Sequence, residues 1–148
     1  MKRNETMFLK DEKLVITELC GDLNTTDIET WQQSLQEVLH QLEPDTKFKI
    51  LVNLHGFNAQ DFETHKKFRV VVPQTLANYG WYVGYLRMFP EAELAIRSRQ
   101  NIFCLAAAHV HHNETKIRNY ADNYSMHNEG FFTNPAEARK WIGAIVID

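Results

Sequence analysis

Short apolar runs alternate with amphipathic segments along this chain, and that alternation is what most constrains its fold. Residues 48–54 and 102–109 are rich in apolar side chains and short enough to be strands buried on both faces. Each is followed by a segment in which apolar residues recur at helical spacing. Strands that alternate with helices are connected by right-handed crossovers, which produce a mostly parallel sheet covered by helices. With 148 residues, the chain is predicted to form a single α/β domain over residues 1–148.

The N-terminal segment predicts a β-hairpin ahead of these units. Residues 7–10 and 13–20 have high β-propensity and flank a turn at Asp11 and Glu12. The strands of a hairpin are antiparallel, so we expect a small mixed sheet that is mostly parallel. An all-antiparallel sheet would contradict this prediction.

The first helix has the clearest start signal. Thr26 and Glu29 have the spacing of a capping box, and Pro44 marks the end of the pattern. An apolar stripe at helical spacing follows the box: Ile28, Trp31, Leu35, Val38, Leu39 and Leu42. Trp31 on this stripe and Trp141 on the stripe of the last helix are both predicted to be core residues.

Three further helices are predicted from their terminal residues. Residues 61–79 keep helical phase, but Pro73 within them should kink or split the helix, and Gly80 is a suitable C-cap. Asn113 is predicted to cap a helix after the strand 102–109, and four residues of that helix are predicted to face inward: Ile117, Tyr120, Ala121 and Tyr124. Asn134, followed by proline, is predicted to cap the last helix.

Composition excludes several classes of protein. Sixteen Lys and Arg against nineteen Asp and Glu, with no basic stripe, argue against nucleic acid as a partner. No apolar run is long enough to span a bilayer, and no signal peptide is apparent. Cys20 and Cys104 form no CxxC pair, which suits a reducing compartment, so we expect a cytoplasmic protein. No cofactor fingerprint occurs, and no cofactor is expected.

Two stretches of the chain resemble the SpoIIAA-like branch of the STAS superfamily. One is the strand 49–54 with its following loop and helix, after the hairpin. The other is the closing pattern FFTNPAEARKWI at residues 131–142, which is similar to the short strand and last helix of the family. The resemblance covers residues 14–61 and 102–142. Residues 81–99 look like an insertion that is atypical of the family.

The resemblance implies a small sheet with helices packed around it and a role in binding rather than catalysis. Members of the family bind regulatory partners or lie beside transporters. Some act through a phosphorylated serine at the start of the helix after the second long strand. In this chain Asp61 is in place, Phe62 occupies the position of that serine, and Thr64 lies two residues further on.

Histidines gather where the strand 102–109 gives way to the helix at Asn113. In open α/β sheets, ligands bind at the carboxyl ends of the strands, and side chains that follow different parallel strands converge there. His55 follows the strand 48–54. Arg87 is placed near the end of a third predicted strand, residues 81–89, after which residues 91–98 are predicted to form a short helix. The candidate ligand-binding residues are His55, Arg87, His109, His111, His112 and Lys116.

The type of ligand remains open at this point. His109 and His111 lie two residues apart and would project to one side of a strand, as a pair of metal ligands would. Alternatively, Lys116 in the first turn of the helix suits an anion. The simplest alternative is a hydrogen-bonded His109, ordinary loop histidines and a solvated lysine. We predict a non-catalytic binding or regulatory domain for a small anion, a lipid-like molecule or a protein; the alternative is a small metal-binding protein or an enzyme.

The ring-rich segment 81–89 predicts self-association. It holds Trp81, Tyr82, Tyr85 and Phe89, more aromatic surface than a sheet this small needs for its core. Two-fold homodimers are the commonest oligomers, so we expect a dimer mass by light scattering at high micromolar concentration. A monomer mass there would contradict the prediction.

Overall fold

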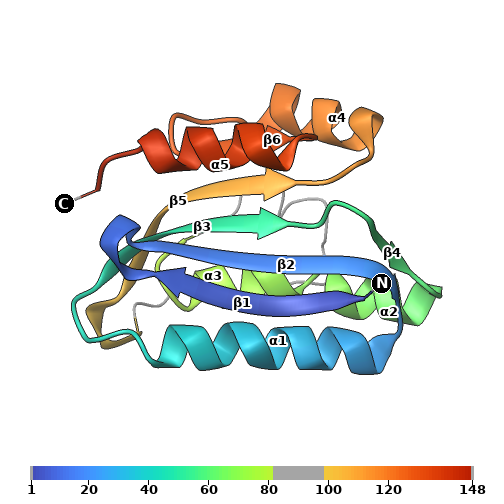
Figure 1. Ribbon diagram of the computed structural model, residues 1–148, viewed down its shortest axis with the longest axis horizontal. Helices are drawn as coiled ribbons and strands as arrows, with labels where there is room; N and C mark the ends of the chain where they lie inside the picture. The colour runs from blue at the N-terminus through green and yellow to red at the C-terminus, as the bar shows by residue number, and fades with distance from the viewer. Residues whose placement is uncertain (1, 82–98, 148) are drawn as a thin grey trace.

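Six strands form one sheet in the computed structural model, which describes residues 2–81 and 99–147 (Figure 1). They are β1 (Arg3–Leu9), β2 (Leu14–Leu23), β3 (Lys47–Asn53), β4 (Phe57–Ala59), β5 (Phe103–Val110) and β6 (Glu129–Phe132). The order across the sheet is β1-β2-β3-β5-β6, and β4 pairs with the end of β2. β1 and β2 are antiparallel, whereas the pairs β2–β3, β2–β4, β3–β5 and β5–β6 are parallel. The predicted α/β class with a mixed, mostly parallel sheet is confirmed.

Helices cover both faces of the sheet. They are α1 (Thr25–His40), α2 (Phe62–Phe68), α3 (Val71–Ala77), α4 (Glu114–Tyr124) and α5 (Pro135–Ala144), with short 3₁₀ turns η1 (Lys10–Glu12) and η3 (Arg99–Asn101). The larger core contains buried side chains of α1, α2, α3 and α4, and a smaller one on the opposite face contains Ala138 and Ile142 of α5. None of the helices in the described ranges is long and apolar enough to cross a membrane.

The capping box of α1 is not the predicted pair Thr26 and Glu29. The Asp27 N–H donates to Asn24 Oδ1, and the Asn24 N–H donates to Asp27 Oδ2, both at 3.0 Å. Lys2 adds an ion pair to this capping box, because its Nζ lies 3.0 Å from the same Asp27 oxygen. The helix therefore begins two residues earlier, and its stripe is buried at Ile28, Trp31, Leu35 and Leu39 as predicted.

The predicted helix over residues 61–79 is split, but not at Pro73. α2 ends at Phe68, and α3 begins at Val71, so Pro73 lies in the first turn of α3. A proline is accommodated there because the first turn of a helix has no internal acceptor for its N–H groups. Gly80 follows α3 with a φ of +76°, and the next N–H, of Trp81, donates to the Leu76 carbonyl at 3.0 Å.

The two tryptophans differ in burial. Trp31 is fully buried, and its Nε1–H donates to Thr17 Oγ1 on β2 at 2.7 Å. Trp141 is only half-buried and packs against the smaller core beside Phe132, so its prediction as a core residue holds only in part. The reason is its place on α5, where it faces β6 at the edge of the sheet rather than the middle.

The strand predicted at residues 81–89, which includes Arg87, and the helix predicted at 91–98 lie outside the described residues, apart from Trp81. That side chain is 9% exposed and belongs to the larger core. The 3₁₀ turn at Arg99–Asn101 then leads into β5.

The difference between the tryptophans gives a test of the core. We expect Trp31→Ala to lower the free energy of unfolding by about 3–5 kcal/mol, since it empties a buried site and removes the hydrogen bond to the Thr17 hydroxyl. Trp141→Ala makes the same chemical change at a half-buried site and should cost clearly less. Urea melts measure both, and a loss below about 1 kcal/mol for Trp31→Ala would show that α1 is wrongly placed.

Candidate functional site

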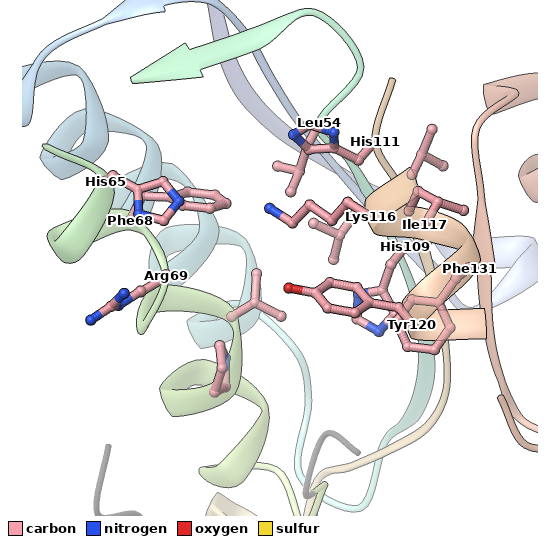
Figure 2. Close-up of a pocket in the computed structure, with 14 residues that line it drawn as sticks. Leu54, His65, Phe68, Arg69, His109, His111, Lys116, Ile117, Tyr120 and Phe131 are labelled. Carbon is pink, nitrogen blue, oxygen red and sulfur yellow. The ribbon is translucent and has the colours of Figure 1, made fainter. Parts of the chain in front are cut away.

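A cavity of about 90 Å³ lies at the carboxyl ends of β3 and β5, between α4 on one side and α2 and α3 on the other (Figure 2). Its apolar walls come from six elements and the chain next to them: Val52, Leu54, Phe68, Val72, Pro73, Val110, Ile117 and Phe131. Its polar lining consists of His65, Arg69, His109, His111, Lys116 and Tyr120. No aspartate or glutamate is among the described residues of this lining.

The parallel pairing of β3 with β5 creates this edge. The two strands end side by side, where the Leu54 N–H donates to the Val110 carbonyl at 2.8 Å. The His111 N–H donates to the Phe132 carbonyl at the end of β6, at 3.1 Å. The backbone on both sides of His109 and His111 is therefore held by neighbouring strands.

α4 carries one of the two cationic side chains among the described lining residues, Lys116; the other is Arg69. Asn113 caps the helix as predicted, accepting from the Lys116 N–H at 3.0 Å. One turn later, the Tyr120 ring lies under the Lys116 ammonium, 5.9 Å from Nζ to the ring centroid. Figure 2 shows Nζ and the Tyr120 hydroxyl both directed into the cavity. Burial lowers the pKa of Lys116 and raises the pKa of Tyr120.

His111 is held as a neutral ring beside that cation. Its Nδ1 accepts from the Asn113 N–H at 3.0 Å, and its ring stacks on His112 with centroids 4.3 Å apart. Burial and then the charge of Lys116 lower the pKa of His111 to about 4. At neutral pH this side chain therefore offers the cavity a dipole rather than a charge.

His109 forms a buried pair with a carboxylate. Its Nε2 lies 2.9 Å from Glu129 Oε2, and both side chains are almost fully buried. The ring stacks on Phe131 at 4.9 Å between centroids. The simplest alternative from the sequence predicted this hydrogen-bonded His109. The same imidazole also lines the cavity.

His65 and Tyr120 belong to the cavity, and sequence reasoning did not select either as a site residue. His65 lies on the same face of the helical pattern as Phe68 and Val72, three and seven residues on, and that phase was a usable signal. Burial, followed by the charges of Lys116 and Arg69, lowers the pKa of His65. Tyr120 was predicted to point inward but only as a core residue.

His55 and His112 lie near the cavity without lining it. The Gly56 N–H donates to His112 Nδ1 at 3.0 Å, and the rings of His55 and His112 are 5.8 Å apart between centroids. Both residues are exposed. The predicted convergence of His55 with His111 and His112 thus occurs, but on the outer surface of this edge. Arg87 lies outside the described residues.

Neither a metal centre nor a phosphorylation switch is evident at this edge. In the described parts of the chain, no three His, Cys, Asp or Glu side chains are arranged to hold a metal ion. Thr64 is fully buried, and its hydroxyl donates to Asp61 Oδ1 at 2.7 Å, so a kinase has no access to it in the folded state. Phe62, at the position of the family's serine, is 66% exposed.

Comparison of the chain with models of protein families, with curated proteins and with solved structures finds no match.

The lowered pKa of His111 gives a prediction for stability against pH. The unfolded chain protonates this ring near its ordinary pKa of about 6.5, whereas the folded protein resists protonation down to about 4. Stability should therefore be unaffected above that range and fall as the pH drops from about 6.5 towards 4. His111→Gln removes the titration, so its urea midpoint should fall less over this interval than that of the wild type.

His127→Gln is the matched control, because it makes the same change at an exposed position outside the cavity. It should keep the acid sensitivity of the wild type. An NMR titration of His111 that gave a pKa at or above the ordinary value would contradict the geometry described for this ring.

Proposed function

We propose that this protein is a STAS-like binding domain that holds a small anion in the cavity at the carboxyl ends of β3 and β5. One observation carries the proposal: the Lys116 ammonium points into a cavity with no carboxylate among its described lining residues (Figure 2). A half-buried cation without a counter-charge is unfavourable, and a bound anion would offset that cost.

The groups around Lys116 also favour a negatively charged ligand. Tyr120 and the imidazoles of His65, His109 and His111 add groups that can donate hydrogen bonds. The nearest buried carboxylate, Glu129, is already engaged by His109. No carboxylate among the described lining residues would therefore repel an anion bound beside Lys116.

The STAS-like part of the proposal rests on the order of elements. β6 followed by α5, with Asn134 accepting from the Ala136 and Glu137 N–H groups, occupies the region that resembles the close of the family's fold. Helices on both faces of a small sheet agree with that resemblance. Because Thr64 is buried, we propose regulation by ligand binding rather than by phosphorylation at that residue.

Catalysis is a second candidate, favoured by the His109–Glu129 pair. A histidine oriented by a buried carboxylate is an arrangement used for general acid–base catalysis. If this pair moved a proton of the ligand, wild-type protein would alter the ligand and His109→Gln would not. Recovery of the ligand unchanged, checked by mass spectrometry, favours binding alone.

Replacing the lysine tests the anion site directly. The probes are benzoate, butyrate, acetate and inorganic phosphate, followed through the backbone amide resonances of His111 and Tyr120 by NMR. We expect at least one probe to shift these amides in the wild type. Lys116→Met keeps the length of the side chain but removes the charge, so it should weaken that binding by at least about tenfold, the effect of losing one charge-assisted hydrogen bond.

Lys66→Met is the control, since Lys66 is exposed on α2 and does not line the cavity. It changes the net charge equally but should leave binding unchanged. Equal binding by Lys116→Met and the wild type would refute the proposed site. Equal losses in both lysine variants would indicate a general effect of charge instead.

A further inference from the structure

We infer that the anion is an organic monocarboxylate with a compact apolar body, of the kind represented by butyrate or benzoate, rather than an inorganic oxyanion or a dianion. The inference rests on the proposed function and names the ligand class of that same site. It comes from the juxtaposition of one ammonium group with walls that are otherwise mostly apolar.

The walls of the cavity favour an apolar body. Val52 and Leu54 come from the end of β3, Phe68 and Val72 from α2 and α3, and Ile117 from α4. An inorganic oxyanion would lose hydration against these side chains and gain nothing from them. A hydrocarbon group is stabilised by the same walls, by about 0.8 kcal/mol for each buried methylene.

The charge of the cavity favours a single negative charge. Lys116 supplies one formal positive charge, and His111 is neutral near pH 7 because its pKa is about 4. The pKa of His65 is also lowered, and His109 is paired with Glu129. Arg69 lies at the rim, where Figure 2 shows its guanidinium turned away from Lys116 and Tyr120. A monoanion matches one ammonium, whereas a dianion would bring an extra buried charge.

The donors and the size of the cavity fit a carboxylate. The Lys116 ammonium and the Tyr120 hydroxyl point into the same space (Figure 2), and a carboxylate has an acceptor oxygen for each. The volume of about 90 Å³ holds several heavy atoms but lies far below the roughly 300–1,000 Å³ of pockets for drug-sized ligands. A nucleotide or a long acyl chain is therefore too large for it.

A panel of small probes separates the two properties of this ligand. Benzoate and butyrate have both the charge and the apolar body. Acetate and inorganic phosphate have charge without that body, and benzamide has the benzoate ring without the charge. Dissociation constants are measured near neutral pH from the amide shifts of His111 and Tyr120.

We expect benzoate or butyrate to bind at least about tenfold more tightly than acetate, phosphate and benzamide, since the buried hydrocarbon and the ion pair each contribute that much. In Lys116→Met, benzoate should fall to the affinity of benzamide. Val72→Thr keeps the shape of one wall but makes it polar, and should weaken benzoate while leaving acetate unchanged. Circular dichroism checks that both variants fold, and the wild-type panel decides the question even where one does not.

The outcomes separate this inference from the function on which it rests. Phosphate or acetate binding as tightly as benzoate and butyrate would overturn the ligand class and leave the anion site standing. Benzamide binding as tightly as benzoate would overturn both, because the charge would then contribute nothing. If no probe shifts these amides at millimolar concentration, the ligand class and the anion site are both refuted.

Discussion

A single extra residue in β5 decides which face of the sheet carries the site. The register of β5 against β3 passes from Phe48 opposite Cys104 to Lys49 opposite Ala106, so Leu105 is left over as a bulge. Side chains alternate between faces along a strand, and one inserted residue reverses that alternation. Cys104 and His109 are five residues apart, yet they lie on the same face: Cys104 belongs to the larger core, and His109 lines the cavity beside it. Without the bulge, a strand that kept Cys104 in the larger core would turn His109 towards α5.

Because the bulge turns His109 to this face, its ring can contact two residues of β6 that hold it in place. Once His109 faces the cavity, its ring reaches Glu129 at the start of β6, two strand positions from Phe131, on which it stacks. β6 pairs with β5 over only four positions, Ala107 to Val110. The His109–Glu129 bond thus adds a side-chain link to a short strand pairing, and the same link fixes which imidazole nitrogen faces away from the carboxylate.

Sequence patterns predicted the elements better than they predicted the site. The α/β alternation and the caps at Asn113 and Asn134 follow from local chemistry, which the sequence records directly. The box that forms at Asn24 and Asp27 also has an ion pair with Lys2, a residue remote in sequence from α1, and local spacing could not show that contact. His109, His111 and Lys116 were found because they follow one strand. His65 arrives from α2, whose packing against α1 and β4 brings it to the cavity, and local sequence patterns do not record that packing.

Two desolvated lysines on opposite faces of the sheet show what is distinctive about the cavity. Lys49 projects under α5, where Nζ donates to the Ile142 and Ile145 carbonyls, both at 2.8 Å, and so satisfies the C-terminal end of that helix. Lys116 is also desolvated, and burial lowers the pKa of both. In the described part of the chain, however, no acceptor of this kind is found for its Nζ. Lys49 therefore stabilises the fold through two backbone acceptors. Lys116 instead directs its ammonium group into the cavity. A domain that retains such a charge is less stable than one with a neutral side chain there, and a ligand that supplies the missing acceptor removes that difference.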